Sequence, residues 1–419
     1  MKRLAIIGSG ISGLSCAHYL QHEYDVTLFE RNNYVGGHTA TKTVVVDEGE
    51  FDIDTGFIVF NDWTYPNFNR LLSQLSVESL DTEMGFSVSC DLTGLEYSGG
   101  SLMTLFAQKK NLLSMKHWRL IRDIIKFNDR SKQVLAEQSL DESITLGQYL
   151  QQLELSQHFS DKYLIPMGAA IWSSGLSQMN DFPALYFLRF FKNHGLLNIN
   201  DRPQWSVVKG GSKSYVDAIL ERKTFNLELN ANIESVTSQA DSVQIIIDGK
   251  SLNFDEVIFA CHSDQALALL AEPNEHHNNV LGRLKYSDNE VVLHTDTSLL
   301  PKLESTWSSW NYKIRADALE TPTLSYSMNI LQQLTSKTQF VVTLNDTARI
   351  EPEKILGRYH YSHPVYTRGT IEAQQLRSTI NGKDGLWFCG AYWYAGFHED
   401  GIRSALDVVN DLGVSIEIL

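Results

Sequence analysis

One short segment near the start of the chain limits what the chain can fold into. Residues 4–7 form an apolar run, and Gly-Ser-Gly-Ile-Ser-Gly follows at once at residues 8–13. Residues 12–22 have the pattern of a helix, and residues 26–29 that of a second buried strand. A GxGxxG turn between a buried strand and a helix binds the diphosphate of a dinucleotide. The segment predicts a Rossmann-like α/β fold with a parallel sheet.

Each glycine of this turn has a physical role. Gly8 permits the tight turn, Gly10 lets a diphosphate approach the backbone, and Gly13 lets the helix pack closely on the strand. Helix N-termini carry unpaired N–H groups and the positive end of the helix dipole. The N–H groups of Ile11 and Ser12 are therefore expected to face the phosphates.

An acid and a second glycine pair extend the pattern. Glu30 ends the second strand, where its carboxylate would accept hydrogen bonds from ribose hydroxyls and repel a 2′-phosphate, which argues against NADP. Arg31 follows, and Gly36-Gly37-His38 comes a few residues later. This continuation resembles the extended ADP-binding signature of two-domain flavoproteins, and the resemblance implies FAD. His38 stands where many such proteins have arginine; a cofactor contact, a covalent flavin link and an ordinary loop histidine all remain open.

Composition excludes several classes of protein. The net charge of −15 argues against nucleic-acid binding, and no apolar stretch reaches the roughly 18 residues that a membrane-spanning helix needs. Glycines interrupt the apolar region after Lys2 and Arg3, so a secretory signal is not expected. The four cysteines form no CxxC pair, and we expect reduced thiols, no metal site and a cytoplasmic location, with peripheral contact to the inner membrane as a further option.

Two later regions extend the flavoprotein pattern. The Gly210-Gly211 pair precedes a helix, like an element of amine oxidases and carotenoid desaturases, and a strand follows whose backbone at Val236 is expected to meet adenine. Near the C-terminus, a strand ends at Gly390, and a glycine-rich turn enters the final helix at residues 396–402. In this turn, N–H groups near Ile402 would face the N1–C2=O edge of the flavin.

Four motifs together identify a family resemblance. They are Gly-Gly-His-Thr-Ala at 36–40, Phe-Asp-Ile-Asp-Thr-Gly-Phe at 51–57, Pro-Met-Gly-Ala-Ala-Ile-Trp-Ser at 166–173 and Gly-Phe-His-Glu-Asp-Gly at 396–401. Over nearly its whole length the chain resembles the flavin-containing amine oxidase and phytoene desaturase superfamily, within a bacterial group of predicted NAD/FAD-binding oxidoreductases. Members of this group often accompany cyclopropane-fatty-acid-synthase-like methyltransferases. One branch is associated with dehydrogenating methylated acyl chains on the route to furan fatty acids.

The resemblance implies a substrate, a partner and a set of site residues. The substrate would be a methylated or unsaturated acyl chain oxidised by hydride transfer to flavin N5, and a lipid methyltransferase would be the partner. Ala391 stands where many relatives have aspartate, so Glu399 or Asp400 is expected to contact the ribityl chain. The expected cofactor residues are Gly8, Gly10, Ile11, Ser12, Gly13, Glu30, Arg31, Gly36, Gly37, His38, Val236, Gly390, Glu399, Asp400, Gly401 and Ile402.

The reacting groups are less well defined by the sequence. His398 and Tyr394, in the loop before the last helix, are the candidates for a catalytic base, and neighbouring aromatic residues could form a wall beside the flavin. His360 and His363 suggest a metal site, but no third ligand is evident. Because no second GxGxxG occurs, we expect electrons to leave to dioxygen, a quinone or a protein acceptor. Two alternatives remain: an amine oxidase, and an isomerase or non-redox flavoprotein partner of a lipid-modifying complex.

The scattered cofactor motifs predict a discontinuous FAD domain at about 1–70, 205–275 and 375–419. A second α+β domain for the substrate would then occupy 71–204 and 276–374, with a polar loop at 272–279 as the crossover point.

One helix of that second domain has an unusual charge pattern. Residues 105–126 hold six Lys or Arg against one acid, with Leu113, Trp118 and Ile125 among the apolar residues on one side. Such a basic amphipathic helix would lie on an anionic bilayer or pack its apolar side into the domain core.

Overall fold

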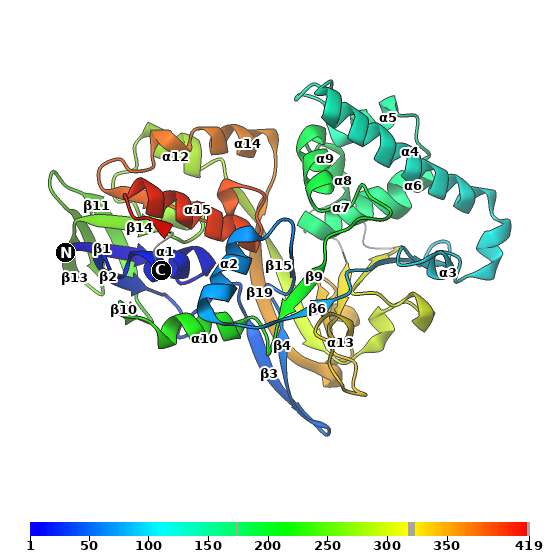
Figure 1. The fold of residues 1–419 in the computed structure, drawn as a ribbon, viewed down its shortest axis with the longest axis horizontal. Coiled ribbons are helices and arrows are strands. Elements are labelled where there is room, and N and C mark those ends of the chain that lie inside the picture. Colours follow the sequence, from blue (N-terminus) through cyan, green and yellow to red (C-terminus); the bar gives the residue numbers. More distant parts are fainter. Residues whose placement is uncertain (173–174, 317–322, 417–419) are drawn as a thin grey trace.

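The computed structural model describes residues 1–172, 175–316 and 323–416 (Figure 1). Ser173, the last residue of the 166–173 motif, lies outside the described residues. The first and last helices lie together in one lobe with a parallel sheet, whereas the helices from α3 (Leu102–Leu105) to α9 (Ala184–Asn193) form the opposite lobe.

A five-stranded parallel sheet forms the centre of the first lobe. Its strand order is β10-β2-β1-β14-β20. The strands are β1 (Lys2–Ile7), β2 (Tyr24–Phe29), β10 (Asn226–Glu228), β14 (Glu256–Phe259) and β20 (Leu386–Phe388). The apolar run after Arg3 becomes the buried middle strand, since parallel strands covered on both faces need continuous apolar residues. The predicted α/β fold class is confirmed.

Helices cover both faces of this sheet. One face carries α1 (Ile11–Leu20), α2 (Pro66–Leu75), α10 (Lys213–Glu221) and α15 (His398–Asp411), whose apolar residues share one core with the sheet. The second core lies beneath the antiparallel sheet of β11 (Ile233–Ser238), β12 (Val243–Ile247) and β13 (Lys250–Phe254), together with α11 (Ser263–Leu269), α12 (Glu275–Leu281) and α14 (Arg368–Gln375). The prediction of a polar loop at 272–279 is wrong for its second half, because Asn274 caps α12 there.

A seven-stranded sheet lies beside the first lobe. Its order is β19-β15-β18-β17-β16-β7-β8, and of its neighbouring pairs only β16 and β7 run parallel. The strands are β7 (Phe86–Cys90), β8 (Leu95–Ser98), β15 (Lys285–His294), β16 (Trp310–Ile314), β17 (Leu324–Ser327), β18 (Val341–Leu344) and β19 (Ile355–Val365). The long β15–β19 pair runs beside the parallel-sheet lobe in Figure 1.

Small sheets connect these parts. One is the hairpin of β3 (Thr41–Val46) and β4 (Gly49–Asp54), and the other joins β5 (Phe60–Asn61), β9 (Trp205–Val208) and β6 (Ser79–Thr82). The predicted domain boundaries at about 70 and 205 fall close to this second sheet, and the division into two domains stays a prediction.

The opposite lobe is helical and has an aromatic core. It contains α4 (Met115–Glu137), α5 (Leu146–Gln152), α7 (Ile165–Trp172), α8 (Leu176–Asn180) and α9 (Ala184–Asn193). Phe127, Phe159, Phe187 and Phe191 are almost fully buried in this core. None of the helices described for this chain is long and apolar enough to cross a membrane.

Candidate dinucleotide and substrate site

The first and last helices of the chain lie side by side and point the same way. The Ser12 hydroxyl donates to the carbonyl of Gly401 at 2.9 Å, and one turn later the Cys16 thiol lies 3.9 Å from the carbonyl of Ala405. Matching steps of four residues show that α1 and α15 run parallel. Both N-termini therefore lie at the same edge of the molecule, where their dipoles add and favour a negative group.

The glycine turns at residues 8–13 and 36–37 are separate in the sequence but adjacent in space, and they complete this edge. The N–H of Gly36 donates to the carbonyl of Ser9 at 3.0 Å, and a Cβ on Gly37 would lie 3.0 Å from the Cα of Gly10. Gly36 and Gly37 have φ values of 125° and 59°, which favour glycine. The 36–37 turn thus packs directly onto the 8–13 turn, and together they form one backbone cradle.

The cradle fits a diphosphate. Gly10 is the N-cap of α1 and has no side chain to cap the helix, and the first turn contains no acid. A Cβ added at Gly10 would meet no atom within 4 Å, so open space lies above these N–H groups. Because first-turn N–H groups have no partner within their own helix, a bound anion is the group that would satisfy them.

Glu30, the predicted ribose-binding acid, is held in position by two residues that the sequence analysis did not single out. One carboxylate oxygen of Glu30 accepts from the N–H and hydroxyl of Ser9 at 3.0 and 2.6 Å. The other accepts from the N–H and side-chain amide of Asn32 at 2.8 and 2.9 Å. Ser9 lies inside GxGxxG and Asn32 two residues after the acid, but both are variable positions of the motif and gave no signal. Arg31 is exposed beside them.

His38 is partly buried, and its Nε2 atom is fully covered. Its ring lies 5.2 Å from Tyr361, 5.6 Å from His363 and 6.0 Å from His262, measured between centroids. Burial, followed by the neighbouring His363 and His262, lowers the pKa of His38 to about 3, so the ring is neutral. Its Nε2 has no hydrogen-bond partner among the described residues, which leaves this atom available to a bound group. A cofactor contact fits this geometry, and the covalent link stays a prediction.

The two acids at the start of α15 bond to backbone N–H groups. The carboxylate of Glu399 accepts from Asn67 N at 3.1 Å and from Phe68 N at 2.9 Å, and so caps α2. Asp400 accepts from Ala395 N and Phe397 N at 3.1 and 2.9 Å within its own loop. These contacts explain how the loop is held; the expected ribityl contact of either acid stays a prediction.

Burial gives Asp400 a measurable effect on stability. Burial, mainly, raises the pKa of Asp400 from 3.8 to about 7. The folded state therefore holds this proton more tightly than the unfolded chain, and the stability that the neutral carboxyl contributes is present at low pH and lost as pH rises through about 7. Between pH 4 and 7 the loss can reach about 4 kcal/mol.

An Asp400→Asn variant should flatten this profile. The amide oxygen keeps both acceptor contacts but does not ionise, so the free energy of unfolding should fall less between pH 4 and 7 than in the wild type. Urea titrations at several pH values measure it. Asp411→Asn, an exposed substitution at the other end of α15, is the control and should leave the slope unchanged. An equal slope in wild type and Asp400→Asn would contradict the prediction.

The two predicted catalytic residues lie in different surroundings. The ring of His398 stacks on Phe57 at 3.7 Å between centroids, and its Nε2 lies 2.9 Å from the hydroxyl of Tyr215. Burial lowers the pKa of His398 well below its usual value, so this histidine is neutral. The hydroxyl of Tyr394 instead donates to Asp407 at 2.5 Å, beneath the guanidinium of Arg403. A direct catalytic role for either residue stays a prediction.

An aromatic wall forms where the loop before α15 meets the helical lobe. Phe397 stacks on Phe190 at 4.9 Å and lies 5.8 Å from His194, between centroids. Tyr186 stacks on Tyr366 at 5.6 Å. These five residues come from α9, the end of β19 and the 391–397 loop, and we call them the aromatic wall. Burial lowers the pKa of His194 to about 4, so the wall carries no charge at neutral pH.

The remaining predicted cofactor residues are placed as follows. The carbonyl of Val236 accepts from the N–H of Ala271 at 3.0 Å, so its backbone is partly engaged. Gly390 donates its N–H to the Ser404 hydroxyl at 2.8 Å, which joins the end of β20 to α15. Ile402 is fully buried one residue after the α1 contact. His360 is exposed on β19, whereas His363 lies near His38; no group of three or more potential metal ligands occurs in 1–172, 175–316 and 323–416.

A buried polar knot, the hydrogen-bonded side chains around Asp54, fixes the Gly210-Gly211 pair, and no sequence pattern predicts these contacts. Asp54, at the end of β4, accepts from the N–H and hydroxyl of Ser212 at 2.9 and 2.7 Å and from the Thr41 hydroxyl at 2.6 Å. Gly211, with φ of 90°, lies so close to Thr41 that a Cβ would come within 2.5 Å. The knot places Tyr215 of α10 beside His398.

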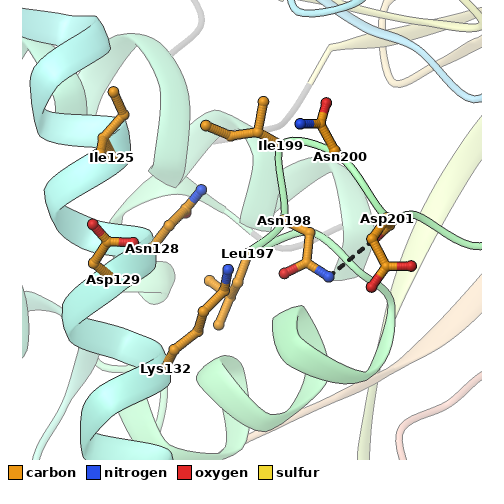
Figure 2. Close-up of a pocket in the computed structure, with 9 residues that line it drawn as sticks. All are labelled: Ile125, Asn128, Asp129, Lys132, Leu197, Asn198, Ile199, Asn200 and Asp201. Carbon is orange, nitrogen blue, oxygen red and sulfur yellow. Dashed lines mark hydrogen bonds between the residues drawn. The ribbon is translucent and has the colours of Figure 1, made fainter.

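An open cavity lies away from these elements (Figure 2). It has a volume of about 280 Å³ between α4 and residues 197–201. Lys132, Asp129 and Asp201 line it together with Ile125 and Ile199. None of its residues belongs to the predicted cofactor or catalytic set.

Comparisons with known proteins agree with this geometry. Residues 11–338 match the family model described as flavin containing amine oxidoreductase. Over 98 residues, 23% of this chain and 18% of the relative, the sequence is 36% identical to the 1-hydroxycarotenoid 3,4-desaturase of Flavobacterium sp. (strain P99-3). The matched part is therefore less than a fifth of that protein's length.

Two solved structures share the fold over almost the whole chain. The CLA-producing fatty acid isomerase from P. acnes superposes with a TM-score of 0.69 at 13% identity, covering 98% of both chains. Cyclohexylamine oxidase from Brevibacterium oxydans IH-35A superposes with a TM-score of 0.65 at 14% identity, covering 98% of this chain and 99% of the other. At these identities the likeness establishes the architecture alone.

Proposed function

The chain belongs to the family of flavin-containing amine oxidoreductases, and from this premise we propose that it oxidises a hydrophobic substrate, a methylated or unsaturated fatty acyl chain. The family makes it an FAD-dependent oxidoreductase.

The uncharged aromatic wall is the observation that carries this proposal. An ammonium substrate would lose its hydration against Phe190, Phe397 and neutral His194 without gaining a counter-charge, and burying an unpaired cation is costly. Asp400, which follows Phe397 by three residues, has its pKa raised to about 7 and already accepts two backbone N–H groups. An acyl chain would lose nothing there and would gain apolar burial.

The chemistry divides between cofactor and chain. Bound FAD would supply the two-electron acceptor, taking a hydride from a substrate carbon at N5. Glu30, the glycine cradle and the unpaired His38 Nε2 would hold the cofactor. The parallel N-termini of α1 and α15 would favour negative charge at the edge that they share. The aromatic wall would orient the acyl chain and exclude water.

Other parts of the proposal follow from the same class of substrate. The proton lost with the hydride would leave to a neutral acceptor, for which His398 is our candidate. Electrons would pass on to dioxygen, a quinone or a protein. A lipid methyltransferase that supplies the methylated chain would be the natural partner, and the cytoplasm the natural location.

Anaerobic mixing tests the substrate class. FAD-loaded protein is mixed with a phospholipid carrying a methyl-branched, unsaturated acyl chain, and the oxidised flavin absorbance is followed. We expect bleaching with this lipid and none with putrescine. Bleaching by the amine alone would contradict the proposal, and lipid product formed while the flavin stays oxidised would instead identify an isomerase.

A variant of the aromatic wall tests whether this wall binds the lipid. Phe397→Ala should slow flavin reduction by the lipid at least tenfold, a loss of about 1.4 kcal/mol, because the chain loses its apolar support. Phe51→Ala, the same truncation of a partly buried phenylalanine in the β3–β4 hairpin, should leave the rate unchanged. Flavin content of both variants is measured first, so that a slower rate cannot arise from lost cofactor.

A further inference from the structure

A basic apolar face lies at the outer end of the helical lobe, around the start of α4. In Figure 1 this cyan segment lies on the opposite side of the molecule from both termini. It spans α3, the 3₁₀ helix η1 (Lys109–Leu113) and the first turns of α4. The face consists of Met103, Lys109, Lys110, Leu112, Leu113, Met115, Lys116, Trp118, Arg119 and Arg122.

The apolar members of this face lie in water. Leu113 is 91% exposed, Met115 87% and Met103 86%, values close to those of an unfolded chain. Single exposed apolar residues are ordinary, but a group within one short segment marks a contact surface. The other side of the helix supplies the core contacts, through buried Leu120 and Phe127. Packing within the chain therefore accounts for the buried apolar residues of α4 but not for the exposed ones.

Hydrogen bonds and ring contacts hold the segment that carries this face in place. The indole N–H of Trp118 donates to the carbonyl of Leu112 at 2.9 Å. Nε2 of His117, a buried residue, lies 2.9 Å from the carbonyl of Leu105, and the Ser114 hydroxyl caps α4 by accepting from His117 N. The ring of Phe106 lies 5.0 Å from that of Trp118, between centroids. The face is thus a defined part of the fold.

The charge of the face is opposite to that of the protein. Residues 105–126 carry six cations and one acid in a chain of net charge −15. Among the described residues, Lys109, Lys110 and Lys116 form no ion pair. The acid, Asp123, is buried and lies 3.9 and 3.8 Å from Arg119 and Arg122. Most of this positive charge is available to an anionic partner.

We propose that this face docks the protein on the surface of an anionic phospholipid bilayer. Leu113, Met115 and Trp118 would enter the acyl boundary, while the lysines remain with the lipid phosphates. Exposed aliphatic side chains and unpaired lysines lie on the same face. This face can therefore contact the acyl boundary and the lipid phosphates of one bilayer surface at the same time. The face shares no residue with the aromatic wall, so docking does not depend on which substrate the protein oxidises.

Vesicle flotation tests the proposal with the FAD-loaded protein. The protein is mixed with vesicles of phosphatidylcholine alone or of equal parts phosphatidylcholine and phosphatidylglycerol. We expect co-flotation with the anionic vesicles, weakened by salt, and little with the neutral ones. The triple variant Lys109→Glu, Lys110→Glu, Lys116→Glu should bind anionic vesicles at least tenfold more weakly. Leu113→Ser with Met115→Ser should also weaken binding.

A matched control separates the face from net charge. Lys223→Glu, Lys250→Glu, Lys383→Glu makes the same charge change at exposed lysines elsewhere and should bind like the wild type. All variants are checked for flavin content and thermal unfolding, which the exposed substitutions should not alter. Equal binding by both triple variants would overturn the proposal. So would no flotation with either vesicle, which would point to an acidic protein as the partner.

Discussion

A Gly10→Ser variant should fold at least as well as the wild type without FAD and yet bind FAD at least a hundredfold more weakly. Gly10 has ordinary extended backbone angles, φ −67° and ψ −179°, and a Cβ there would meet no protein atom within 4 Å. Serine is a favoured N-cap residue, and its hydroxyl would accept from an N–H in the first turn of α1. The same hydroxyl would occupy the space and the donors that a diphosphate needs, a loss of about 3 kcal/mol in binding.

Two measurements separate the effects on folding and binding. Thermal unfolding of the cofactor-free proteins should give a variant as stable as the wild type, or more stable by up to about 1 kcal/mol. Fluorescence titration with FAD gives the affinity. Gly99→Ser is a control for the substitution itself, because this exposed glycine after β8 also lacks a left-handed φ and its Cβ would meet only the carbonyl oxygen of Phe86, at 3.9 Å. Wild-type affinity in Gly10→Ser would refute a diphosphate site at α1.

A Gly13→Ala variant should fail in the opposite way, by losing the fold. A Cβ on Gly13 would lie 1.9 Å from the carbonyl oxygen of Gly8, 3.0 Å from its carbon and 3.2 Å from the Cβ of Ala260. The clash is mainly with backbone that β1 and β14 hold rigidly, so α1 would have to move off the sheet. We expect a loss of at least about 3 kcal/mol in the free energy of unfolding, or insoluble protein.

The same substitution elsewhere should be harmless. Gly369 lies in the first turn of α14, and its Cβ would meet only side-chain atoms, the nearest being a terminal nitrogen of Arg283 at 3.5 Å. Gly369→Ala should therefore be neutral or slightly stabilising, since alanine favours helix. Urea unfolding compares both variants with the wild type. A Gly13→Ala protein of wild-type stability would contradict the close packing of α1 on the sheet.

The local signals of the cofactor segment were sufficient to predict its structure. Residues 4–13 predicted β1, the turn and α1, because steric and apolar requirements there act between near neighbours. The glycine pair at 36–37 was also recognised, but its contact with Gly10 was not. That contact depends on how two separate loops pack, which no periodicity encodes.

Long-range polar contacts were the main omission. Glu399 caps α2 across more than three hundred residues, and Asp54 binds Ser212 across 158. In the sequence each acid is an ordinary polar residue in a loop or at a strand end. Likewise the basic helix predicted within residues 105–126 begins only at Met115 and continues to Glu137, because its later turns are polar on their exposed side and show little apolar period.

The pairing of α1 with α15 has a consequence for how the chain is made. Ser12 is translated 389 residues before its partner Gly401. Until Gly401 has been translated, α1 lacks its partner α15, and the apolar residues of α1 that pack on α15 stay uncovered. We therefore expect stable flavin loading only after α15 has been translated and has packed on α1.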